Sequence, residues 1–204
     1  MEYIALTISL MALAISGLTF WLTRVKRGVV KMTRPTAIAF GPDGAGQEHK
    51  KVVIRTLLYS TSDQGRYIQN MYVRLQKGEA THNFNVWGIY YSNGPVRAGG
   101  LFINKSGLAC YHHFLMPKGG GDYDFSAGEY LLQVYVELVD ESPRKMFEQK
   151  VFLTNIQEEE MKTKKVGIQF DWAPNTQNYS SYVAASSRKN EEFTDLMRRM
   201  MDEK

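Results

Sequence analysis

The pattern of hydrophobic positions divides the chain into two parts with different periods. Tyr3–Leu22 is a run of twenty residues without a charge. As a helix it would be about 30 Å long, which matches the hydrocarbon core of a bilayer. From Pro35 onward apolar and polar residues alternate with the period of two that is typical of strands. We therefore expect a transmembrane helix over residues 1–22, a basic linker over 23–35 and a β domain over 36–185.

Ten segments of the second part have the strand pattern, and clusters of Gly, Pro, Asn and Asp separate most of them. The expected strands are Thr36–Phe40, Lys51–Ser60, Ile68–Gln76, Asn83–Tyr91, Leu101–Asn104, Gly107–Met116, Tyr130–Val139, Lys145–Leu153, Gly167–Trp172 and Tyr179–Val183. Many short strands with few helices indicate an all-β fold, an antiparallel sandwich or barrel.

Two segments favour helices. Thr154–Lys165 begins with a residue that can cap a helix, has acidic residues in its first turns and ends in lysines. In the tail, residues 186–204, Asn190 can cap a short amphipathic helix with an apolar stripe of Phe193, Leu196, Met197, Met200 and Met201. Such a stripe packs on its own domain or docks to a partner or a membrane, and methionine suits adaptable partner surfaces.

One strand carries a recognisable signature. The run Gly128-x-Tyr130-x-Leu132-x-Val134 resembles the penultimate core strand of immunoglobulin-like β-sandwiches, in which a corner tyrosine hydrogen-bonds back to the chain. Trp87 is similar to the buried tryptophan of the mid-domain strand of that fold. Leu132 stands where an antibody domain has its second cysteine. The resemblance covers about a dozen residues and implies an architecture, not a function.

The positive charge of the chain is concentrated after the apolar run. The formal net charge is +4, and residues 1–35 account for all of it. Their basic residues are Arg24, Lys26, Arg27, Lys31 and Arg34, against a single acid, Glu2. Because Lys and Arg remain on the cytoplasmic side of a span, we expect the N-terminus outside and the β domain at the cytoplasmic face of the inner (plasma) membrane. The same side chains can contact anionic lipid headgroups.

Two other interpretations of the charge and the apolar run are disfavoured. A cleaved signal peptide needs a basic N-terminal region and a shorter apolar stretch, and Met1–Tyr3 contains no basic residue. The β domain has no net charge, so we expect no nucleic-acid partner.

Small residues share one face of the expected span. They are Ala5, Ser9, Ala12, Ser16 and Thr19, at alternating spacings of four and three. Such a face lets helix backbones approach closely in lipid, which favours self-association or docking to another span, although small residues are common in spans in general.

The candidate chemistry is limited to Cys110, His112 and His113. On a strand Cys110 and His112 share one face and His113 takes the other, so the two histidines do not ligate one ion without a bulge. The single cysteine allows no internal disulfide, and no hydrolase, metalloprotease or nucleotide-binding motif occurs. We therefore predict no catalytic, cofactor-binding or metal-binding residue.

These patterns predict a non-enzymatic, membrane-anchored scaffold that binds other proteins. The candidate partners are membrane proteins, cytoplasmic proteins and a second copy of the chain, which would give a homo-oligomer. Two alternatives remain open. One is a metal- or thiol-dependent enzyme centred on Cys110, His112 and His113. The other is an extracytoplasmic sandwich that binds envelope polymers through the aromatic residues Tyr90 and Tyr91.

Overall fold

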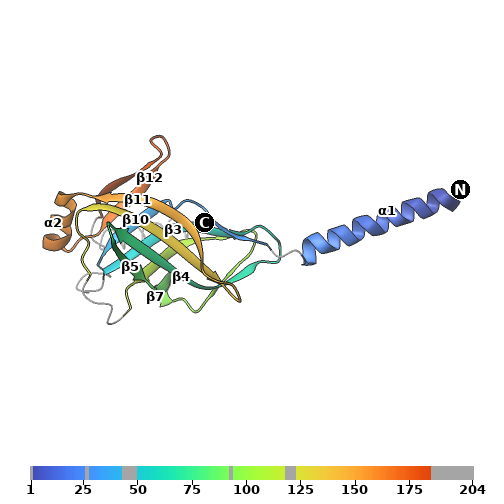
Figure 1. The fold of residues 1–204 in the computed structure, drawn as a ribbon, viewed down its shortest axis with the longest axis horizontal. Helices are drawn as coiled ribbons and strands as arrows, with labels where there is room; N and C mark the ends of the chain where they lie inside the picture. Colours follow the sequence, from blue (N-terminus) through green and yellow to red (C-terminus); the bar gives the residue numbers. More distant parts are fainter. Residues whose placement is uncertain (1, 26–27, 43–49, 92–93, 118–122, 185–204) are drawn as a thin grey trace, which may run out of the picture.

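A computed structural model describes residues 2–25, 28–42, 50–91, 94–117 and 123–184. The chain begins with helix α1 (Glu2–Phe20), which continues into a wider π-helical turn, η1 (Trp21–Val25). This helix extends away from a β domain (Figure 1), and every side chain from residue 2 to 25 is exposed. It is long and apolar enough to cross a membrane, as a permanent span or a signal sequence would be.

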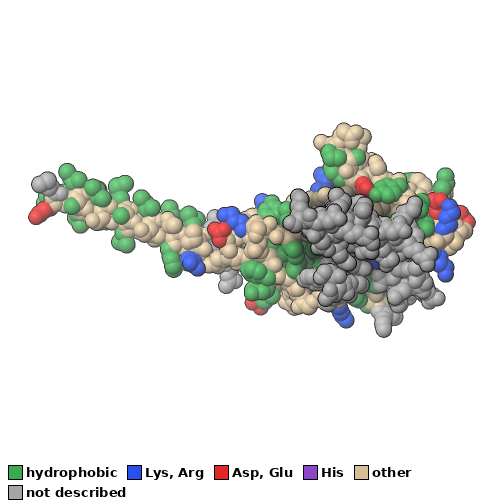
Figure 2. Space-filling model, turned by 180° about the vertical axis from the view of Figure 1, so that it is seen from behind, with side chains coloured by type: hydrophobic (Ala, Val, Ile, Leu, Met, Phe, Trp, Pro, Cys, Tyr) green, Lys and Arg blue, Asp and Glu red, His purple; other side chains and the backbone are tan. Residues whose placement is uncertain are grey.

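Four hydroxyl side chains of the helix form hydrogen bonds with its own backbone. The hydroxyls of Thr7, Ser9, Thr19 and Thr23 donate to the carbonyl oxygens four residues earlier, at 2.7–2.9 Å. Such bonds lower the cost of placing hydroxyls in hydrocarbon. The side chains of residues 2–25 are exposed all round the helix, and Figure 2 shows hydrophobic side chains along the face that it presents.

The β domain consists of two antiparallel sheets. The larger one has eight strands in the order β13-β12-β2-β3-β9-β6-β7, with β1 also paired to β3. The smaller one has five strands in the order β11-β10-β4-β5, with β8 also paired to β4. The strands are β1 (Val30–Met32), β2 (Ala37–Pro42), β3 (Lys50–Ser60), β4 (Arg66–Lys77), β5 (Ala80–Phe84), β6 (Val86–Tyr91), β7 (Gly94–Arg97), β8 (Leu101–Ile103), β9 (Leu108–Leu115), β10 (Gly128–Leu138), β11 (Arg144–Leu153), β12 (Ile168–Ala173) and β13 (Asn178–Val183).

Buried side chains from both sheets form one hydrophobic core. Strand β10 shows the pattern most clearly, because every second residue from Tyr130 to Leu138 is buried and the residues between them are partly exposed. The expected inward face of this strand is confirmed. Tyr130 also hydrogen-bonds back to the chain: its hydroxyl donates to the Ser126 carbonyl at 2.7 Å and accepts from the Ser126 amide at 2.9 Å.

The structure adds two strands to the expected set and divides one. Strand β1 lies in the segment expected as a linker, and β7 was not predicted. The prediction of one continuous strand over Asn83–Tyr91 is wrong, because the chain leaves the smaller sheet at Asn85 and enters the larger one as β6. As a result Trp87 is buried as expected, but it lies in the sheet that does not contain Tyr130.

The expected connector helix is confirmed as α2 (Asn155–Lys164). Thr154 caps it: its hydroxyl accepts from the Gln157 amide at 3.2 Å, while the Gln157 side chain accepts from the Thr154 amide at 3.0 Å. This reciprocal pair satisfies two amides of the first turn. Helix α2 lies at the end of the domain opposite to α1 (Figure 1). The expected tail helix falls outside the described residues.

Candidate functional site

Two of the three candidate residues, the buried His112 and the half-buried Cys110, form a hydrogen-bonded group with Trp87. His112 on β9 is fully buried. Its Nδ1 accepts a hydrogen bond from Trp87 Nε1 at 3.1 Å, and its Nε2 lies 3.4 Å from Cys110 Sγ. The indole N–H can only donate, so Nδ1 carries no proton and Nε2 must carry the proton of the neutral ring. His112 therefore donates to the Cys110 sulfur and is in the wrong tautomer to accept its proton.

Burial shifts the pKa values of Cys110 and His112 so that the neutral, less reactive form of each is favoured. It lowers the pKa of His112 to about 4, with a smaller contribution from the nearby charge of His113. It also raises the pKa of the Cys110 thiol to about 11. A reactive cysteine needs the opposite shift, toward the thiolate. The arrangement thus supplies a neutral imidazole, which accepts from the Trp87 indole, and a neutral thiol, which accepts from the imidazole.

His113 does not join this group. Its position on β9 alternates with the buried His112, so it lies on the outer face of the larger sheet, opposite Val53 of β3. In the described ranges, no three His, Cys, Asp or Glu side chains gather closely enough to hold a metal ion. The placement of His112 and His113 on opposite faces of β9 is as the strand pattern predicts.

A second region is the junction between helix and sheet, where side chains of the β domain contact the end of η1 and the chain that follows it. Gln64, in the loop before β4, donates through its side chain to the Arg24 carbonyl at the end of η1. Arg66 donates to the Gly28 carbonyl at 3.1 Å and forms an ion pair with Glu141. Arg144 donates to the Val30 carbonyl at 2.9 Å. Side chains from three separate loops and strands therefore hold the chain where it leaves the helix.

Close packing of the backbone reinforces this junction. Val29 and Thr61 exchange two hydrogen bonds, from the Val29 amide to the Thr61 hydroxyl at 2.9 Å and from the Thr61 amide to the Val29 carbonyl at 3.0 Å. At Gly28 a Cβ atom would lie 2.6 Å from the Ser60 hydroxyl and 2.7 Å from the Ser62 amide nitrogen. The chain thus enters β1 through a space that only glycine fits.

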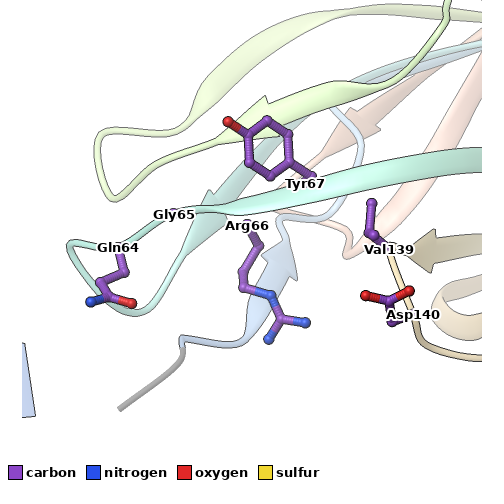
Figure 3. Close-up of a pocket in the computed structure, with 6 residues that line it drawn as sticks. All are labelled: Gln64, Gly65, Arg66, Tyr67, Val139 and Asp140. Carbon is purple, nitrogen blue, oxygen red and sulfur yellow. The ribbon is translucent and has the colours of Figure 1, made fainter. Parts of the chain in front are cut away.

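Two shallow hollows lie beside the junction and share Tyr67 and Val139. The first is lined by Gln64, Gly65, Arg66, Tyr67, Val139 and Asp140. Figure 3 shows that Arg66 and Tyr67 leave opposite sides of β4, and that Val139 and Asp140 approach from the loop after β10. The second hollow is bordered by Leu101 and Phe102 of β8. We call the exposed side chains of Tyr67, Phe102 and Val139 the proximal patch.

Sequence reasoning missed the junction and the proximal patch. The signal for Phe102 was present, because Leu101 and Ile103 on either side of it are apolar and a strand must turn every second residue outward. One outward aromatic residue is ordinary, and it becomes informative only when the fold places a second one beside it, as it does Tyr67 beside Phe102. No sequence signal identifies Gln64, Arg66 and Arg144 as ligands of backbone carbonyls, since that role depends on the path of the chain.

The five basic residues after the helix have different positions. Arg24 and Lys31 are exposed near the helix exit, and Lys26 and Arg27 lie outside the described residues. The Arg34 guanidinium stacks over the Trp172 ring at 3.8 Å, and Tyr179 next to that ring donates to the Pro35 carbonyl at 2.7 Å. Arg34 therefore helps to attach the β12–β13 hairpin to the chain that enters β2.

The other predicted contact residues are placed only in part. Ala5, Ser9, Ala12, Ser16 and Thr19 are exposed along α1. The apolar stripe of the tail lies outside the described residues, and so do the side chains of Tyr90 and Tyr91.

Comparison with models of known protein families finds no match to this chain, and comparison with curated proteins finds none either.

Proposed function

We propose that this chain is a single-pass membrane protein whose helix spans the bilayer and whose β domain lies at the cytoplasmic face of the inner membrane. The observation that carries the proposal is the helix over residues 2–25, which is apolar and exposes every side chain although a hydrophobic core is available beside it. Apolar side chains of this number are stable only in lipid or against other spans. The basic residues after the helix support the cytoplasmic placement of the domain.

The junction supports a domain held close to the membrane. Gln64 contacts the last turn of the helix, and Arg66 and Arg144 hold the first residues after it. With these bonds in place, the domain has little freedom to move far from the helix exit.

The proposed activity is binding of other proteins, without catalysis. The cluster of Cys110, His112 and Trp87 supports this because its groups satisfy one another and its thiol and imidazole are both held neutral. A second copy, or another membrane protein, would pack on the small face of the helix, at Ala5, Ser9, Ala12, Ser16 and Thr19. Cytoplasmic partners would be captured by the tail stripe of Phe193, Leu196, Met197, Met200 and Met201.

We further propose that the domain is an immunoglobulin-like sandwich with additions. The adjacent strands β2, β3, β9 and β6 have the order of the A, B, E and D strands of that fold, and β4, β10 and β11 have the order of C, F and G. In this assignment the Tyr130 corner lies at the start of strand F, as in true members. Strands β12 and β13 extend the larger sheet, and Trp87 belongs to strand D rather than C.

Reporter fusions after Lys204 test the placement. We expect a reporter that is active only in the cytoplasm to work and one that is active only outside to fail. Replacing Arg24, Lys26 and Arg27 by Glu should reduce or invert that preference, whereas the same replacements at Lys162, Lys164 and Lys165 should not, because they are far beyond the span. Activity of the external reporter in the unchanged chain would reject the cytoplasmic placement and favour the envelope-binding alternative.

Association through the helix has a matched test. Ala12 lies on the small face, and Ala14 lies on the opposite side, since successive residues turn by 100°. We expect Ala12→Leu to reduce cross-linking between copies, or co-purification of a membrane partner, and Ala14→Leu to leave both unchanged. Equal behaviour of the two variants would reject association through this face.

A further inference from the structure

The proximal patch is a group of exposed apolar side chains on the β domain near the helix exit. The exposed fractions are 63% for Tyr67, 50% for Phe102 and 47% for Val139. Tyr67 and Phe102 lie directly opposite each other on β4 and β8, with ring centroids 4.8 Å apart. Two aromatic rings that contact each other in water, on the outer face of a sheet, form a surface that favours a less polar environment.

The backbone holds this patch in place. Gly65 has a φ of +40°, and a Cβ atom there would lie 2.4 Å from the edge of the Phe102 ring and 2.8 Å from the Ile103 carbonyl oxygen. The Phe102 ring therefore rests on the bare backbone of Gly65. The patch is a built surface, because its geometry depends on a glycine that a larger residue would not replace.

The patch lies on the side of the domain that faces the helix. Gly65 follows Gln64, whose side chain contacts the Arg24 carbonyl, and Arg66 next to Tyr67 donates to the Gly28 carbonyl. Figure 2 shows hydrophobic side chains on the domain surface next to the base of the helix. The aromatic residues where α1 passes into η1, Phe20 and Trp21, are exposed as well.

We propose that the proximal patch is a second membrane contact, in which Tyr67 and Phe102 enter the headgroup region of the leaflet from which the helix emerges. This inference rests on the proposed membrane span. Tyrosine and other amphipathic rings favour that depth. Two of the three acidic neighbours are paired, Asp63 with Lys105 at 3.2 Å and Glu141 with Arg66. The third, Asp140, is exposed beside Val139, at the rim of the patch.

A protein partner fits the patch less well than a lipid surface. Stable protein interfaces bury about 800 Å² on each side, and three side chains of this kind supply only a part of that area, since an aromatic side chain buries about 150–250 Å². A lipid interface requires no matching shape and only a small area beside an existing span. With both contacts made, the domain would have one fixed orientation on the membrane.

Quenching of tryptophan fluorescence by lipid tests the inference in the full chain. The protein is reconstituted into vesicles of phosphatidylcholine and phosphatidylglycerol whose acyl chains carry bromine near the headgroup. A tryptophan is introduced by Tyr67→Trp or, independently, by Phe102→Trp. The matched control is Phe152→Trp, because Phe152 is 60% exposed on the outer face of the same sheet and lies beside α2 at the far end of the domain.

We expect the emission added at residue 67 or 102 to be quenched about as strongly as that of Trp21, and the emission added at residue 152 to be retained. The difference between the unchanged chain and Trp21→Phe gives the signal of Trp21. Quenching of Trp21 without quenching at 67 and 102 overturns the second contact and leaves the span intact. Absence of quenching at Trp21 overturns the span itself.

Discussion

Two regions of the molecule differ from what their residue types suggest. One is the group of Cys110, His112 and Trp87, and the other is the exposed proximal patch. A cysteine and a histidine are candidates for chemistry, yet both lie against the core and are held neutral. Tyrosine, phenylalanine and valine are residues of the core, yet Tyr67, Phe102 and Val139 are exposed. Residue type therefore indicates which chemistry or contact a side chain can provide. Its burial decides whether the side chain is accessible to a substrate or a partner.

The largest expected effect concerns the neutral state of His112. Its pKa is lowered from 6.5 to about 4 in the folded chain, so the unfolded chain binds a proton in that pH range and the folded chain does not. The free energy of unfolding should be constant above pH 6.5 on account of this group, and should fall by about 3 kcal/mol as the pH falls from about 6.5 to about 4.

Urea unfolding of the full chain in detergent micelles measures this loss. His112→Gln keeps an acceptor for the Trp87 indole and removes the titration, so its stability should lack this part of the pH dependence. Carboxylates contribute equally to both proteins. Identical pH profiles for the two would show that His112 is free to protonate in the fold and that the cluster is open.

The next effect is the low reactivity of the Cys110 thiol compared with that of an exposed thiol. Burial raises its pKa from 9.0 to about 11, which lowers the thiolate fraction near neutral pH about 100-fold. Alkylation by iodoacetamide should be slower by about that factor than in a Cys110→Ala, Phe152→Cys variant, whose thiol is exposed. Equal rates would identify Cys110 as an accessible thiol and would restore the enzyme alternative.

The next effect is the difference in stability lost when the glycine in each of the two turns that flank β4 is replaced by alanine. Gly65 and Gly78 both have a positive φ, but an added Cβ overlaps Phe102 and the Ile103 carbonyl at Gly65 and meets nothing within 4 Å at Gly78. Gly78→Ala should cost about 1 kcal/mol for the left-handed backbone alone. Gly65→Ala should cost about 2–3 kcal/mol, because a rigid backbone oxygen must also move. Equal costs in urea unfolding would mean that the proximal patch is not fixed by its glycine.

The smallest effect is the difference in stability lost when the hydroxyl of the buried Tyr130 or of the exposed Tyr67 is removed. Tyr130→Phe removes both hydrogen bonds to Ser126 and should lower the free energy of unfolding by about 1–2 kcal/mol. Tyr67→Phe should change it by less than about 0.5 kcal/mol, as expected for a surface substitution. A cost at Tyr67 as large as that at Tyr130 would show that the Tyr67 hydroxyl has a structural role.

Much of the fold follows from local pattern, because alternation is a property of each strand by itself. The inward face of β10, the cap at Thr154 and the corner at Tyr130 were all legible in the sequence. The crossing at Asn85 was harder to see. Its sequence signal is the adjacent apolar pair Val86-Trp87 after Phe84, which breaks the period of two, and the structure buries Phe84 and Trp87. Strand β1 has only three residues, and its pairing with β3 depends on the path of the chain from the helix.

The candidate sites are formed by contacts between residues far apart in the chain, which the sequence pattern alone does not predict. The sequence predicted that Cys110 and His112 share a face, and the structure agrees. It did not predict that Trp87 would donate to His112, because this contact joins β6 to β9 across 25 positions. The proximal patch depends on which end of the domain receives the helix, and only the assembled junction fixes that.

Protease protection tests the central claim most directly. Intact cells that produce the chain, or sealed right-side-out vesicles made from them, are treated with a protease before and after the membrane is opened. The account predicts that the β domain survives as an intact fragment until the membrane is opened and that it then remains with the membrane fraction unless it is cut near the helix exit. Removal of the domain from sealed vesicles would contradict the cytoplasmic placement, and recovery of the uncut chain in the soluble fraction would contradict the span.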